Sequence, residues 1–351
     1  MQNMGTETKQ QRNYGISILK IWMSFEVILI HAWDRNESGI LLFPFRKIQS
    51  FAVPVFMLCA FFFFSSALFE GNWRKLGKRI KRLFVPLLLW AVIYVLILNV
   101  VYLICGGDYL NFYDLLLQTI TGHVEKINTA MWFQVDLIIL TFIFFLLIRF
   151  FKGKFWLLAS ILFGLSLFLQ YSGINYHLFE SLPYEFKFPL GRLCEMIPVC
   201  IVGIFFAKAK TLIERKQKRY LFIALLLFLI GIRGILGYFD VIPSIEGYGS
   251  AGIDYTLVPT VLFGIFYLLP LEEIPGKMKT VITYFEQGTV HIYCIHILVL
   301  RLIMIIFGVD MLDHSFIECI LIYVVCFLSS VVIRKIEKEL TKMLFKKRKR
   351  V

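Results

Sequence analysis

Charged side chains are scarce in this chain of 351 residues, because Asp, Glu, Lys and Arg make up only 17% of it. Soluble domains of this length are nearer a quarter charged, so the shortage argues against a soluble fold. Metal-type spacing is also missing from the seven cysteines, most of which lie in apolar runs, where a free Cys behaves as a small hydrophobe. The sequence therefore predicts neither a disulfide framework nor a metal site.

Apolar residues dominate instead: they form 59% of the chain, and the mean hydropathy is +0.75. They occur in runs of roughly 17 to 25 residues, the length with which a helix crosses about 30 Å of hydrocarbon. We therefore expect an all-α integral membrane protein, a single bundle of about ten transmembrane helices. The expected spans are 15–33, 48–68, 83–104, 131–150, 155–171, 194–209, 220–238, 255–270, 283–306 and 315–333.

The distribution of basic residues predicts the orientation. A net charge of +13 would suit a nucleic acid, but Lys and Arg cluster in the short segments between spans, which argues against that partner. With both termini in the cytoplasm, 28 of the 37 basic residues fall in inner segments and 6 in outer ones, as the positive-inside rule requires. The remaining three, Lys20, Arg233 and Arg301, lie within spans.

This orientation predicts a multi-pass protein of the inner (plasma) membrane, in contact with the lipid bilayer. The expected parts are a cytoplasmic N-terminal tail (1–14), one transmembrane domain (15–333) and a basic cytoplasmic C-terminal tail (334–351). The first span is not a cleavable signal peptide, because Lys20, Glu26 and His31 interrupt it and no small-residue cleavage site follows. The sequence carries no signal for an oligomeric state.

Ionisable groups in the first span invite a functional explanation, since each costs roughly 2.5–3.5 kcal/mol at the centre of a membrane helix. Lys20 and His31 are eleven residues apart, close to three helical turns, so they share one face. An imidazole titrates near neutral pH, so His31 is a candidate general base for a hydroxyl. The alternative is an interfacial histidine hydrogen-bonded to a loop. Glu26 points to another face, where we expect it to pair with a neighbouring helix.

A strongly basic stretch, GNWRKLGKRIKRLFVPLLLW, covers 71–90, where Pro86 opens the third span. Arg79 and Arg82 are three residues apart and therefore neighbours on a helix surface. Such a pair binds phosphate through bidentate, charge-assisted hydrogen bonds. The alternative is an ordinary anchor on anionic lipid head groups.

Six segments, in order along the chain, resemble the integral-membrane acyltransferase family 3, whose members O-acylate cell-surface glycans. Their shared features are a basic residue with a histidine eleven positions later, an Arg-x-x-Arg segment followed by proline, a Trp-Phe helix start, a glycine-containing helix and a late Tyr-x-x-His. The segments are ISILKIWMSFEVILIHA (16–32), FAVPVFMLCAFFFF (51–64), KRIKRLFVPLLLW (78–90), AMWFQVDLIIL (130–140), MIPVCIVGIFFAK (196–208) and TVHIYCIHILVL (289–300). The resemblance runs from about 16 to 333, and six matches in register are hard to produce by chance.

The resemblance implies that an acyl group passes from a cytoplasmic acyl-CoA to a hydroxyl of an extracytoplasmic or membrane-facing glycan. It assigns the catalytic histidine to His31 and the CoA phosphates to Arg79 and Arg82, with Lys20 on the same donor side. Lys20 stands where the family usually has arginine, so the charge is kept without the bidentate fork.

A second departure lies in the second span, where Cys59 and Ala60 replace the family's usual Ser-Gly pair. Both residues are small enough for close helix packing, but the hydroxyl is lost.

Further candidates for the acceptor side lie near the outer halves or ends of other spans. Tyr293 and His296 share a helix face, and they either join His31 around an acceptor or fasten helices together. Arg233 and Arg301 either bind an anionic sugar or pair with Glu195, Glu318 or an outer-loop acid, and pairing is the expected role. Trp132 marks a span end, where interfacial aromatics are common.

The expected function is that of an O-acyltransferase, with acetyl as the expected group, acting on a surface polysaccharide or its lipid-linked precursor. Acyl-CoA would be a donor substrate, with no bound cofactor. An alternative is a glycan exporter or flippase of the same architecture, which would tolerate loss of Arg79 and Arg82 but depend on Arg233 or Arg301. A third alternative, a degenerate membrane scaffold, would be insensitive to His31→Ala.

Overall fold

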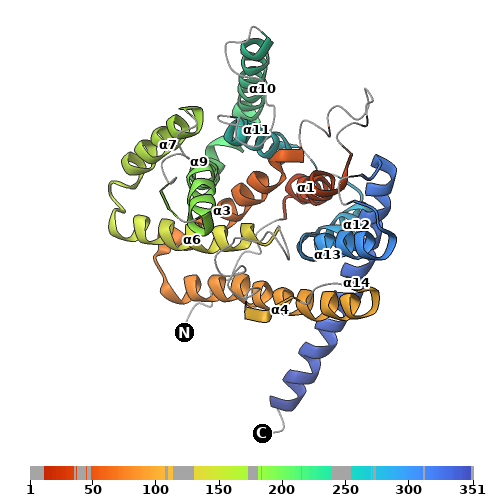
Figure 1. Cartoon of the computed structure of the whole chain (residues 1–351). Helices are drawn as coiled ribbons and strands as arrows, with labels where there is room; N and C mark the ends of the chain where they lie inside the picture. The colour runs from red at the N-terminus through yellow and green to blue at the C-terminus, as the bar shows by residue number, and fades with distance from the viewer. Residues whose placement is uncertain are drawn as a thin grey trace.

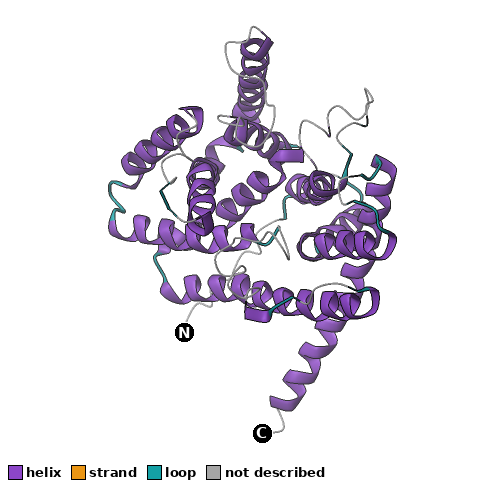
Figure 2. Cartoon of the chain, viewed as in Figure 1, coloured by secondary structure: helices purple, strands orange, loops and turns teal. Residues whose placement is uncertain are grey.

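The structure, a computed structural model, contains helices and no strand among the residues it describes (Figure 2). The described residues are 12–34, 37, 45, 49–106, 110–113, 130–172, 181–182, 184–214, 216–238, 254–269, 271, 274–310 and 313–348. The expectation of an all-α fold is therefore confirmed.

The helices follow the apolar runs of the sequence. Their bounds are α1 (Tyr14–Ala32), the short 3-10 helix η1 (Gln49–Phe51), α3 (Ala52–Glu70), α4 (Trp73–Cys105), α6 (Trp132–Phe150), α7 (Phe155–Ser172), α9 (Tyr184–Ile213), α10 (Lys216–Tyr238), α11 (Asp254–Leu268), α12 (Gly276–Glu286), α13 (Thr289–Phe307) and α14 (Phe316–Arg348). By length and composition, α1, α3, α4, α6, α7, α9, α13 and α14 could each cross a membrane. The protein is thus an all-α membrane protein. The total of ten spans and the cytoplasmic termini stay predictions.

Two expected boundaries differ from the structure. The helix that contains the third span begins ten residues before the expected start at 83: α4 begins at Trp73, where the Asn72 side chain accepts a hydrogen bond from the Arg74 amide, and it continues through Pro86. The ninth run, expected over 283–306, is divided: α12 ends at Glu286 and α13 begins at Thr289.

Helix α1 lies among the other helices rather than at the edge of the molecule (Figure 1). It packs against α3, α11, α12, α13 and α14. Gly15 brings α1 directly against α11, because a Cβ there would lie 1.8 Å from the Phe266 carbonyl oxygen. At Gly203 of α9, a Cβ would lie 2.6 Å from the Leu58 carbonyl oxygen of α3. Small residues at these contacts let the backbones approach closely and fix α1 and α3 relative to their neighbours.

The Glu26 side chain, fully buried in α1, bonds within its own helix. Its Oε1 accepts a hydrogen bond of 2.6 Å from Nε1 of Trp22, one turn earlier. The expectation that Glu26 pairs with a neighbouring helix is therefore wrong, because a tryptophan four residues earlier lies on the same side of the helix.

Candidate functional site

Among the residues that the structure describes, three cavities follow α1 from its N-terminal part to its C-terminal end. We call them the inner cavity (about 430 Å³), the middle cavity (about 330 Å³) and the outer cavity (about 170 Å³). Lys20 and Phe63 line both the inner and the middle cavity, and Tyr293 lines both the middle and the outer one. Each cavity therefore shares lining residues with the next one along α1, and His31 borders the outer cavity.

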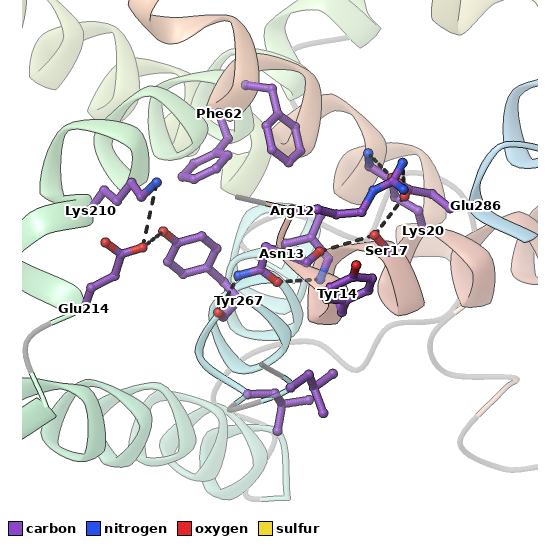
Figure 3. A pocket seen from close by; sticks show the side chains of 14 residues that line it. Arg12, Asn13, Tyr14, Ser17, Lys20, Phe62, Lys210, Glu214, Tyr267 and Glu286 are labelled. Atoms are coloured by element: carbon purple, nitrogen blue, oxygen red, sulfur yellow. Dashed lines mark hydrogen bonds and ion pairs between the residues drawn. The ribbon is translucent and has the colours of Figure 1, made fainter. Parts of the chain in front are cut away.

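One side of the inner cavity carries an ion-pair network centred on Glu286 (Figure 3). Nζ of Lys20 donates a hydrogen bond of 3.0 Å to Oε1 of Glu286, while Nη2 of Arg12 lies 3.3 Å from Oε2. Oγ of Ser17 donates to the same Oε2 at 2.8 Å. Burial raises the pKa of Glu286, but Lys20, Ser17 and Arg12 together lower it further, so the net pKa lies below its usual value. The carboxylate is therefore ionised at neutral pH, and Lys20 is already paired.

The opposite side of the inner cavity holds a second polar group (Figure 3). The Tyr267 hydroxyl donates a hydrogen bond of 2.5 Å to Oε1 of Glu214, and Nζ of Lys210 lies 3.9 Å from the same oxygen. Three cations and two carboxylates thus line this cavity, a surface that suits an anionic ligand able to displace carboxylates from its cations.

The middle cavity is mostly apolar, with Lys20 and Arg79 among its lining residues. The Arg79 guanidinium lies 4.4 Å from the centroid of the Phe64 ring, and its Nη2 donates to the Ala60 carbonyl at 3.4 Å. Arg82 is exposed on α4 and lines none of the three cavities. The structure therefore brings only one arginine of the sequence-predicted pair into the site.

His31 lines the outer cavity at the C-terminal end of α1 and makes no hydrogen bond with the residues that the structure describes. The loop bond that would explain an interfacial histidine is thus absent from the described part of the chain. Trp132 and Tyr293, two of the acceptor-side candidates, line the same cavity together with Glu195 and Tyr255.

A buried ion pair beside His31 was not found by sequence reasoning. Nε of Arg192 in α9 donates to Oδ2 of Asp136 in α6 at 3.2 Å, and Asp136 is fully buried. The Arg192 guanidinium also lies over the Trp132 ring, 4.7 Å from its centroid, and lines the outer cavity. Asp136 itself could have indicated this pair, since an aspartate within an apolar span is costly without a partner.

His296 lies beside His31 and does not line the outer cavity. Its ring centroid lies 5.5 Å from that of His31, and the side chain is fully buried. Tyr293, one turn earlier on α13, donates a hydrogen bond from its hydroxyl to the carbonyl of Ala130, two residues before α6. The fastening of helices, one of the two alternatives that the sequence left open, is therefore present at Tyr293, whereas a role around an acceptor stays a prediction.

Arg233 and Arg301, which the sequence placed within spans, line none of the three cavities. Arg233 forms a bidentate pair with Asp254, with Nε–Oδ1 and Nη2–Oδ2 distances of 2.8 and 2.7 Å. Its expected pairing with an acid is therefore confirmed, although Asp254 begins helix α11 instead of lying in a loop. Arg301 of α13 interacts with Tyr102 of α4.

The fold defines a polytopic membrane protein, and ionisable side chains line the cavities along α1. The sequence profile of the acyltransferase 3 family, described as an acyltransferase domain, matches residues 13–335. The chain belongs to this family and is a membrane-embedded acyltransferase. No curated protein and no solved structure matches the chain significantly.

Proposed function

We propose that this acyltransferase moves an acetyl group from cytoplasmic acetyl-CoA to a hydroxyl of a cell-surface polysaccharide or of its lipid-linked precursor. One observation carries the proposal: cationic side chains line the inner and middle cavities, His31 lines the outer cavity, and Tyr293 is a wall common to the last two. A donor and an acceptor that enter from opposite ends would meet beside that wall.

The donor occupies the inner and middle cavities. Its phosphates bind Arg12, Lys20 and Arg79, which line those cavities. At Arg12 and Lys20, the phosphates compete with the Glu286 carboxylate. The apolar walls of the middle cavity suit the extended pantetheine arm, which brings the thioester to Tyr293. Arg82, exposed on the same helix as Arg79, adds long-range attraction to the anionic donor.

The acceptor occupies the outer cavity. Its reacting hydroxyl faces His31, while Arg192, Glu195 and the Trp132 ring offer polar and apolar contacts to the sugar. His31 takes the hydroxyl proton as the oxygen attacks the thioester carbonyl; the C–O bond forms, the C–S bond breaks, and the proton passes to the departing thiolate. No metal or bound cofactor takes part in these steps.

The test is O-acyl analysis of the envelope glycan from a deletion strain complemented with wild type, His31→Ala or His291→Ala. Wild type restores O-acetyl groups, and His31→Ala lowers the transfer rate by about 10²-fold or more, the usual range for a general base. His291 is the matched control, because its Nε2 lies 3.6 Å from Oε2 of Glu337 and it lines none of the three cavities.

A second measurement identifies the donor. Membrane vesicles that carry the protein receive radiolabelled acetyl-CoA and glycan extracted from the deletion strain. Label in the glycan supports acetyl transfer. Glycan acylation that survives the deletion, or full activity of His31→Ala, would overturn the proposal.

A further inference from the structure

The hydrogen bonds of His296 fix which of its ring nitrogens carries the proton. Nδ1 lies 2.8 Å from the Tyr293 carbonyl oxygen and 3.2 Å from that of Ile292. A carbonyl oxygen only accepts, so Nδ1 is the donor, and Nε2 of the neutral ring holds a free lone pair. That Nε2 is buried and has no hydrogen-bond partner among the described residues. An unpaired buried acceptor costs about 1–3 kcal/mol, so its presence calls for an explanation.

The neighbour of this ring is His31. The two ring centroids are 5.5 Å apart and the planes are inclined by 36°. His31 borders the outer cavity, whereas His296 is fully buried and does not line it. At this centroid separation, rotations that turn a nitrogen of each ring toward the other ring would bring the two nitrogens to a hydrogen-bonding distance of about 3 Å.

We propose that His296 is a positioning residue for His31: its Nε2 accepts a hydrogen bond from the His31 N–H on the side away from the acceptor. This inference rests on the proposed function. When His31 takes the acceptor proton it becomes an imidazolium with two N–H groups, and one of them donates to His296. His296 keeps its own proton on Nδ1 throughout, and the proton held by His31 leaves with the CoA thiol.

This arrangement resembles the part of a catalytic triad that orients the histidine, with a neutral ring in place of the carboxylate. A neutral acceptor suits a buried membrane site, because it fixes the tautomer of His31 without a buried negative charge beside it.

Three substitutions of His296 separate this role from packing. His296→Leu fills the space but offers no acceptor. His296→Gln places an amide oxygen near the position of Nε2, whereas the shorter His296→Asn reaches only toward Nδ1. Initial rates are measured in membrane vesicles with radiolabelled acetyl-CoA and glycan from the deletion strain, and they are normalised to the amount of protein in the membrane.

We expect His296→Leu and His296→Asn to lower kcat by about 10- to 100-fold, the value of a hydrogen bond to a charged group, with KM for acetyl-CoA changed by less than about twofold. His296→Gln recovers at least about half of that loss on a logarithmic scale. In the His31→Ala background, His296→Leu has little further effect, because the two residues act as one unit.

Full activity of His296→Leu would overturn the inference. An equal decrease of kcat in His296→Gln and His296→Asn, or a rise in KM without a decrease of kcat, would do the same. So would an undiminished effect of His296→Leu in the His31→Ala background. If the Leu variant fails to accumulate in the membrane, the Gln and Asn pair decides. Failure of the proposed function looks different, because His31→Ala itself would then transfer label at the wild-type rate.

Discussion

Two ion pairs flank the path along α1, and they differ in how far water reaches them. In the outer pair, the Asp136 side chain is 0% exposed and Arg192 14%, whereas in the inner pair Lys20 is 23% exposed and Glu286 14%. The inner carboxylate also has a second cation, Arg12, and a hydroxyl donor, Ser17. The outer pair therefore resembles a structural element that needs both partners, and the inner pair resembles a set of charges whose partners can be exchanged.

The difference in exposure between the two ion pairs agrees with the ligand proposed for each end of the path. A charge wholly inside the protein is tolerated only with its partner, so the outer pair holds Arg192 over Trp132 at a fixed place on the cavity wall. At the inner end, a phosphate that displaces Glu286 from Lys20 replaces one anion with another in a partly hydrated site, so the net cost of exchange is small. We therefore expect changes to the outer pair to affect stability and changes to the inner pair to affect donor binding.

The largest effect is expected from Asp136→Ala. Removing one partner of a buried pair costs about 3–5 kcal/mol, so the variant should unfold at a much lower temperature in detergent and transfer little acetyl. Asp136→Asn, which keeps an oxygen for Arg192, is the milder control, and Glu286→Gln is the matched change at the inner end. An unfolding temperature of Asp136→Ala equal to that of wild type would remove the distinction between the two pairs.

A smaller and more selective effect is expected from Lys20→Met. Loss of one direct phosphate contact should raise KM for acetyl-CoA by about tenfold and leave the unfolding temperature close to that of wild type. Lys20→Arg keeps the charge and should retain a KM near that of wild type. Saturation curves at low and high salt provide the measurement, since screening weakens the contact in wild type more than in Lys20→Met. An unchanged KM would place the donor phosphates elsewhere.

Substitutions of the two arginines of α4 also test donor binding, with a smaller expected change in KM. Arg79 lines the middle cavity and Arg82 does not, so Arg79→Ala should raise KM for acetyl-CoA several-fold, by about 1 kcal/mol, and Arg82→Ala by less than about twofold. The comparison needs the two saturation curves side by side. An equal rise of KM in the two variants would support the sequence-based prediction that both arginines bind the phosphates directly.

Hydropathy predicted where helices form, because a membrane helix must bury about twenty consecutive apolar residues, whichever helices it packs against. It could not predict the start of α4 at Trp73, which depends on the cap formed by the Asn72 side chain. Nor could it predict the division between α12 and α13, which falls at Gln287 and Gly288.

The candidate site was predicted in part. The shared face of Lys20 and His31 follows from spacing within one helix, and both residues border the cavities. The Asp136–Arg192 pair joins α6 to α9, and no periodicity within one helix reports which helices meet. Arg192 was also assigned to an outer loop, because the expected sixth span began at residue 194 while α9 begins at Tyr184.

The smallest effect on transfer is expected when the Arg233–Asp254 pair is removed as a unit. This pair joins α10 to α11 and lines none of the three cavities, so Arg233→Leu with Asp254→Asn should transfer acetyl groups at a rate within about twofold of wild type, per amount of protein. Changing both partners avoids leaving a buried carboxylate alone, which would lower stability for an unrelated reason. Glycan O-acetyl content and surface glycan amount are measured together in the complemented strain. Loss of surface glycan with full acetyl transfer in vesicles would contradict the expectation and favour a glycan exporter, whose substrate path would then run along α10 and α11 instead of along α1.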